Sequence, residues 1–497
     1  MKNFIFLIIA LACSRSFGQT TVKVIDRSTG ESIPYANILC NQTESLMSNA
    51  EGFFTVPEKN SADDVTLAVS YIGYAPVQTT LGQLRATQMT ILLQPSVYEL
   101  DQVDVGKLPS ANAIMASVRK YLQQNYAGGG KISQNSVFLR ESNYIIPKKF
   151  DFEIDESTGF TKNNLKAANA EMSTFTSRII SNPPREYVDM LCRYYSPGKA
   201  AAPGKLEVIK ATKLKDENRA VSLEGLQGSF TKLLLKHLDT TKFYKVRSGW
   251  FGSNDTVSLR KDFKSSKKKP ANSEVTSAKS RLASVYEKNS FLSKDFQFIH
   301  EPDLYNYKYE GAVLLTDGNL AYVISFSPDR NKADYKGKLV ISASDFGIVR
   351  ADYELDEGKT LDGVNLKLLL GIKVSDNLRK GTIIYRQNPS GEGYYLQYAS
   401  REAGQYIYVH RPVKFVELSK SEKDVVEFDV KIEGNLFGKT EYLNLSQKEI
   451  AEGDYEKISE PDFKYIKIKQ YDPLIWKDYS AIEPLQEMKR YKLEGEQ

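Results

Sequence analysis

Histidine is the residue type in this chain that could hold a catalytic metal. The sequence contains three histidines, which are His237, His300 and His410. A zinc peptidase site needs a histidine with a glutamate three positions after it, plus a distant second histidine. The residues at that position are Thr240, Asp303 and Val413. The spacing therefore predicts hydrogen-bonded structural histidines, and it excludes peptidase chemistry of that type.

Other short motifs also fail to specify a reaction. Gly128-Gly129-Gly130 lacks the Gly-Lys-Ser/Thr of a phosphate loop and predicts a flexible turn. Asp345-Phe346-Gly347 lacks the other kinase motifs and predicts a turn between strands. Carboxylates are plentiful but dispersed along the chain, so the sequence does not identify two of them as a general acid–base pair. We assign no catalytic, cofactor-binding or metal-binding residue and expect a non-enzyme, with an unrecognised hydrolase as the alternative.

The first residues have the pattern of a secretory signal peptide. Lys2 precedes an apolar run at 4–12, and the small residues Ser16 and Gly18 follow two positions apart. The run is about half of the roughly 20 residues that a bilayer-spanning helix needs. We expect residues 1–18 to be removed and the protein to be exported, as a periplasmic or outer-membrane-associated protein.

The three cysteines allow further interpretations. Cys13 could be the lipidated first residue of a membrane-tethered protein, but the preceding Ala10-Leu11-Ala12 places leucine one position later than such signals do. Cys40 and Cys192 fall in different expected domains, so we expect two buried thiols. A disulfide between them is the alternative, because export would permit one.

Length and charge narrow the class of protein. A chain of 497 residues predicts two or three domains, and 11% aromatic residues favour strands. Between Arg260 and Lys294 ten basic residues stand against three acids. This basic loop, 260–294, predicts a solvated linker. The alternative is peripheral contact with anionic lipid headgroups or polysaccharide. Nucleic acid is not expected as a partner of an exported chain.

Residues 19–96 alternate short strands with turns, which is typical of a β-sandwich. The ordered segments Val24-x-Asp26, 33–38, 49–54 and 70–74 resemble the carboxypeptidase regulatory-like domain. Residues 100–105 are similar to the strand that ends this domain in nutrient-importing outer-membrane receptors. The resemblance implies a seven-stranded prealbumin-like sandwich that docks or spaces other parts and does not catalyse.

Residues 97–126 are expected to be a connecting strand and a helix. The helix begins after Ser110, a plausible N-cap, and places Ile114, Val118 and Leu122 on one face. A second helix is predicted at 226–238. Residues 127–497 then form a β-rich envelope domain.

Successive strands with short turns between residues 304 and 432 predict an antiparallel meander. The expected strands, after alternating tyrosines at 305–309, are 320–326, 338–341, 348–355, 364–374, 382–385, 394–398, 405–415 and 425–432. The predicted fold class is therefore mainly β with α+β character: the sandwich, a helix, and a large antiparallel curved sheet or half-barrel.

The strands at 322–328 and 335–341, with the turn at 345–349, resemble a region found in uncharacterised envelope proteins. They are also loosely similar to the half-barrel of periplasmic lipoprotein carriers. We therefore expect a non-catalytic exported protein of the cell envelope that binds a protein or glycan partner. The alternative is a periplasmic lipid or lipoprotein carrier that uses the curved sheet as an apolar trough.

Overall fold

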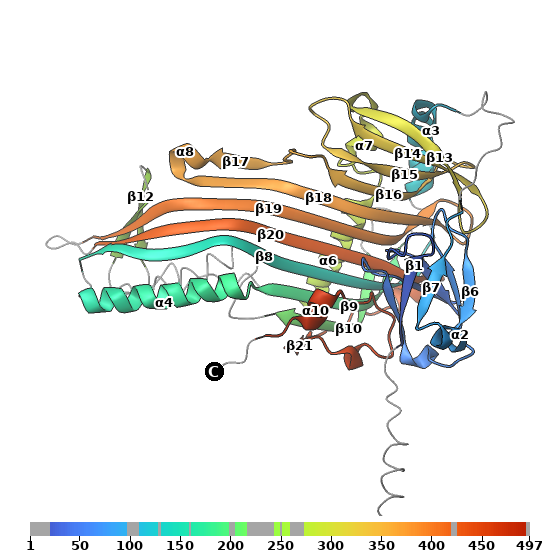
Figure 1. Ribbon diagram of the computed structural model, residues 1–497, viewed down its shortest axis with the longest axis horizontal. Helices are drawn as coiled ribbons and strands as arrows, with labels where there is room; N and C mark the ends of the chain where they lie inside the picture. The colour runs from blue at the N-terminus through green and yellow to red at the C-terminus, as the bar shows by residue number, and fades with distance from the viewer. Residues whose placement is uncertain are drawn as a thin grey trace, which may run out of the picture.

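The computed structural model describes residues 20–96, 109–127, 131–158, 161–197, 204–215, 243–248, 251–258, 273–418 and 425–493. The expected signal peptide, Cys13, His237 and the expected helix at 226–238 lie outside these residues. The described chain is mainly β, with a small N-terminal pair of sheets followed by one large open sheet (Figure 1). This architecture confirms the predicted fold class.

The N-terminal unit packs a three-stranded sheet, in the order β4-β1-β7, on a four-stranded sheet, in the order β3-β2-β5-β6. Their bounds are β1 (Thr20–Asp26), β2 (Asn37–Cys40), β3 (Glu44–Met47), β4 (Phe53–Val56), β5 (Thr66–Ser70), β6 (Val77–Thr80) and β7 (Thr90–Leu93). Val24 and Phe54 of one sheet and Ile38 and Leu67 of the other are buried in one core. The seven strands are those of the predicted sandwich. A short helix, α2 (Leu81–Ala86), follows β6.

Within the described residues, the large sheet has 14 strands. Its main path runs β13-β14-β15-β16-β18-β19-β20-β8-β9-β10-β21, and β11, β12 and β17 are attached to it. The bounds are β8 (Ser133–Ser157), β9 (Arg185–Ser196), β10 (Lys205–Lys215), β11 (Phe243–Ser248), β12 (Phe251–Ser258), β13 (Tyr305–Leu314), β14 (Leu320–Pro328), β15 (Tyr335–Ser342), β16 (Ile348–Leu355), β17 (Gly363–Leu366), β18 (Ile372–Gln387), β19 (Tyr394–Glu417), β20 (Val425–Glu449) and β21 (Ile466–Ile468). Along this path the pairing is antiparallel except between β10 and β21.

Several strands are longer than the sequence pattern predicts. The two strands expected at 394–398 and 405–415 are one strand, β19. The polar residues between them suggest a turn, but Glu402 pairs with Lys380 of the next strand at 3.3 Å. Gly404 also continues the ladder, because it pairs with Leu378 on one side and with Phe437 on the other. A Cβ at this position would lie 2.9 Å from the Phe437 ring, so glycine suits the close approach. Polar side chains that form ion pairs with the neighbouring strand are thus compatible with one continuous strand.

The prediction of one strand at 364–374 is wrong, because the segment is interrupted. A one-turn helix, α8 (Lys367–Leu370), separates β17 from β18. Gly371 ends this helix with φ 66°, in the left-handed region that glycine adopts most readily. A segment rich in leucine and valine, which predicts one strand, therefore forms a hairpin.

One face of the large sheet carries the main core. Because side chains alternate along a strand, residues opposite one another in the register share a face. On this face the buried row is Leu339, Ala351, Ile383, Ala399, Tyr442, Leu139 and Met190. Helices α3 (Ala111–Tyr126), α6 (Glu274–Asn289) and α7 (Gln297–His300) contribute to the same core. Farther along, α4 (Lys162–Ser181) packs on the same face over β8.

Helix α3 confirms the prediction made from its apolar face. Ser110 is its N-cap and accepts a hydrogen bond from the backbone N–H of Ala113 at 3.2 Å. Ile114, Val118 and Leu122 are buried against the sheet. The helix is therefore part of the large core. Among the described residues, no helix is both long and apolar enough to cross a bilayer.

The expected basic loop at 260–294 contains a helix, which corrects that prediction. Over 274–289 the chain forms α6, with Val275, Leu282 and Val285 buried in the main core. Two of its basic residues are paired: Lys279 lies 2.9 Å from Glu460, and Arg281 lies 2.9 Å from Glu141. The high net charge of this segment predicted a solvated loop. Its apolar residues, however, recur with the period of an α-helix, so one face of the helix lies in the core.

Replacing Leu282 by alanine should lower the free energy of unfolding by about 2–5 kcal/mol, because the substitution leaves a cavity in the main core. Chemical denaturation measures the change. The matched control, Glu287→Ala on the exposed face of α6, should shift the unfolding midpoint little. Equal shifts would mean that α6 does not pack in the core.

Cys40 and Cys192 should resist thiol reagents. Both are free and buried, and burial is the main cause that raises their pKa values, to about 11 and about 12. At pH 8 little reactive thiolate is therefore present. In the chain that begins at Gln19, a disulfide-exchange reagent should titrate no thiol in the folded state and two after denaturation. A fast native reaction, or only one reactive thiol after unfolding, would contradict this.

Candidate functional site

The sandwich lies against the face of the large sheet that is opposite the helices. Phe138, Leu191, Tyr398 and Leu443 are aligned across four strands and pack with Met47 of the sandwich. The ring of Tyr35, also from the sandwich, lies 4.9 Å from that of Tyr398. This apolar patch fixes where the two units meet.

The C-terminal segment, residues 473–491, lies between the sandwich and the sheet. Its Trp476 is buried, with its ring 5.4 Å from that of Phe138. The backbone N–H of Glu58 donates to the carbonyl of Lys477 at 2.7 Å. Figure 1 shows helix α10 (Gln486–Arg490) on the sheet beside the sandwich. The segment therefore connects the two units.

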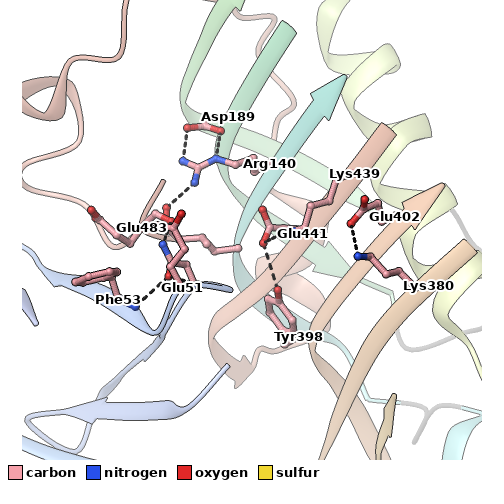
Figure 2. A network of polar contacts seen from close by, with 12 residues as sticks. Glu51, Phe53, Arg140, Asp189, Lys380, Tyr398, Glu402, Lys439, Glu441 and Glu483 are labelled. Carbon is pink, nitrogen blue, oxygen red and sulfur yellow. Dashed lines mark hydrogen bonds and ion pairs between the residues drawn. The ribbon is translucent and has the colours of Figure 1, made fainter. Parts of the chain in front are cut away.

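Glu483 of this segment is held by the Asn49 turn of the sandwich. Asn49 donates its side-chain N–H to the carbonyl of Glu483 at 3.1 Å. Its amide oxygen accepts from the N–H groups of Glu51 and Phe53, each at 2.9 Å. Thr55 donates its hydroxyl to the Glu483 carboxylate. The turn that carries the family resemblance is thus also a docking surface (Figure 2).

A buried ion pair anchors the same segment to the sheet. Arg140 of β8 and Asp189 of β9 form two hydrogen bonds of 2.7 Å, and both side chains are less than 5% exposed. Arg140 also donates to the carbonyl of Ile482 at 2.9 Å. Burial opposes the charge on Arg140, but the nearby Asp189 carboxylate outweighs it and raises the pKa of the guanidinium. Figure 2 shows this pair close to Glu483.

A groove of about 530 Å³ lies at this junction. Tyr35 and Ala50 border it from the sandwich, and Leu485 and Glu487 border it from the C-terminal segment. Its floor on the sheet consists of two rows that the strand register aligns. The first row is Lys338, Asp352, Thr382, Ser400, Glu441 and Arg140. The second is Lys336, Glu354, Lys380, Glu402, Lys439, Ser142 and Tyr187.

Charges alternate in sign along the second row. Lys336 lies 3.7 Å from Glu354, and Lys380 lies 3.3 Å from Glu402. Lys439 lies 2.9 Å from Glu441 of the first row. Burial would lower the pKa of Lys439, but the Glu441 carboxylate outweighs it and raises that pKa. Neighbouring side chains of opposite charge therefore fix one another's positions.

The groove can bind a polar group. In the described part of the chain, no cluster of three or more histidine, cysteine, aspartate or glutamate residues could hold a metal. The carboxylates Asp352, Glu402 and Glu441 each have a cationic neighbour within 3.5 Å. Paired carboxylates and tyrosine hydroxyls offer hydrogen bonds and charge complementarity to a ligand.

The two histidines that the structure describes lie away from the groove. His300 bonds through its ring to the carbonyl of Phe291 at 2.9 Å. His410 is half exposed on β19 and lies 3.7 Å from Asp429. The sequence analysis did not identify the residues that line the groove. Asp189 gives one signal in the sequence, because it is a single charge between apolar residues in Val188-Asp189-Met190.

Comparison with known proteins identifies a known domain at the N-terminal end of the chain. Residues 22–105 match the model of the CarboxypepD_reg-like domain. The match confirms the resemblance and leaves the rest of the chain unassigned. No curated protein and no solved structure matches the chain.

Replacing Asp189 by asparagine should destabilise the protein by about 3–5 kcal/mol, because it leaves the buried Arg140 without a counter-charge. Chemical denaturation measures the loss. Glu207→Gln is the matched control, since it breaks the more exposed Arg193–Glu207 pair on the adjacent hairpin. That change should cost less than about 1 kcal/mol. Similar losses of stability in both variants would show that the buried pair contributes no more than an exposed one.

Proposed function

We propose that this chain is a non-catalytic, exported protein of the cell envelope that binds a polar segment of a protein or glycan partner. The observation that carries the proposal is the groove between the sandwich, the C-terminal segment and the sheet. It combines fixed charges of both signs with tyrosine rings. The sandwich forms one wall and braces the C-terminal segment. This role is consistent with a regulatory-like domain that docks and does not catalyse.

The lining favours a polar partner over a lipid. A carrier needs a cavity lined mainly by apolar side chains. Ten of the 22 groove residues are charged: Arg140, Lys336, Lys338, Asp352, Glu354, Lys380, Glu402, Lys439, Glu441 and Glu487. The apolar face of the sheet, which a carrier would need as its trough, is covered by helices whose aromatic and aliphatic side chains are buried against it. We therefore prefer the binding protein to the carrier.

Reversing one groove charge should abolish partner binding. In Glu402→Lys, the new ammonium faces Lys380 and disrupts the alternating row on which a partner's charges would align. The full chain and this variant would be isolated from native envelopes and compared by native mass spectrometry before and after solvent extraction. We expect a polypeptide or glycan that is retained by the original chain and lost from the variant.

The double variant Lys380→Glu/Glu402→Lys is the control for folding, because it restores an ion pair with reversed polarity. It should unfold at a higher denaturant concentration than Glu402→Lys and still fail to retain the partner. It should remain below the original chain, because each exchanged charge then faces a like charge, that of Glu354 or of Lys439, on the next strand. Retention by both variants would place the partner elsewhere. A stoichiometric lipid in the extract of the original chain would instead support the carrier.

A further inference from the structure

An exposed apolar tip lies at the end of the large sheet away from the sandwich. It comprises β17, α8 and the start of β18, residues 363–372 (Figure 1). Leu368 is 101% exposed, Val364 is 52% exposed and Leu366 is 37% exposed. Three neighbouring apolar side chains with this exposure are costly in water, and such patches usually mark an interaction surface.

The tip is held in a fixed conformation. The N–H of Gly371 donates to the carbonyl of Lys367 at 3.1 Å and closes the single turn of α8. The N–H of His410 on β19 then donates to the carbonyl of Gly371 at 2.8 Å. A Cβ at position 371 would lie only 2.0 Å from the carbonyl oxygen of His410, so the turn packs tightly on β19. The backbone of the turn is therefore fixed where Leu366 and Leu368 are exposed.

Lysine and tyrosine side chains surround the base of the tip. The ammonium of Lys367 lies 4.1 Å from the ring centre of Tyr408, and that of Lys373 lies 5.7 Å from that of Tyr406. Tyr406 donates its hydroxyl to Glu433 at 3.2 Å. Cations and amphipathic rings beside exposed leucines match the composition of a membrane interface, where tyrosine and lysine lie at headgroup level.

We propose that this tip contacts the surface of a lipid bilayer, with Leu368 inserted below the headgroups and Lys367 and Lys373 at their level. A second protein chain fits less well, because a stable protein interface buries about 800 Å² on each side and a single protruding turn offers far less. Anionic headgroups complement the two lysines. The tip is distinct from the basic segment at 260–294, and the proposal does not depend on the ligand of the groove.

Labelling Leu368→Cys with a polarity-sensitive fluorophore tests insertion directly. The full chain from Gln19 has no other exposed described thiol, because Cys40 and Cys192 are buried. Vesicles of phosphatidylethanolamine and phosphatidylglycerol should shift the emission to shorter wavelength. Leu474→Cys, which replaces a 68% exposed leucine in the C-terminal segment, is the matched control and should not shift. No shift at position 368, or equal shifts at both positions, would overturn the proposal.

Co-sedimentation with the same vesicles gives the second measurement. Leu368→Ser should weaken the apparent partition coefficient about tenfold, because it removes one inserted leucine. Leu474→Ser should leave it unchanged. Light scattering without vesicles reports self-association. Two results would contradict the proposal. The original chain could form a dimer that Leu368→Ser dissociates, or Leu368→Ser could leave vesicle binding unchanged. Either result would mean that the tip has a partner other than a lipid bilayer.

Discussion

The ion pair between Arg140 and Asp189 is the interaction on which the junction depends. It joins two strands of the sheet and holds the carbonyl of Ile482, and the adjacent Glu483 holds the sandwich. Desolvating two charges is costly, so the pair stabilises this arrangement only while its hydrogen bonds are complete. The C-terminal segment completes them. The groove exists because this segment and the sandwich are fixed at one position over an otherwise open sheet face.

Strand alternation lets one sheet serve two purposes. From residue 399 onward on β19, odd-numbered residues lie on the side of the sheet that carries the helices, and Ala399, Ile407 and Phe415 among them are buried. Even-numbered residues in this part of the strand, such as Glu402 and Tyr408, lie on the opposite side, toward the groove or the solvent. The ladder between β19 and β20 runs from residue 398 to 416 without a register shift. Its polar face therefore continues from the groove toward the tip, while its apolar face supplies the core.

Local pattern was enough to predict the sandwich and helix α3. Both follow from short-range features: turn residues between short strands, and an N-cap before an amphipathic face. The groove could not be predicted, because its rows join residues more than 200 positions apart, such as Arg140 and Glu441. The exposed tip was missed for a different reason. Leu366 and Leu368 lie in an apolar run that predicts a buried strand, and only the left-handed Gly371 shows that the chain turns outward.

The length of the strands separates the two proposed surfaces. His410, beside the tip, and Glu402, in the groove, are eight residues apart on β19, which corresponds to roughly 26 Å. A tip held at a lipid surface would therefore keep the groove clear of the headgroups, where a polar ligand could reach it. A sheet that only had to form a core could be far shorter than the 24 or 25 residues of β8, β19 and β20. Their length is explained if the sheet is a spacer between a membrane and a bound partner.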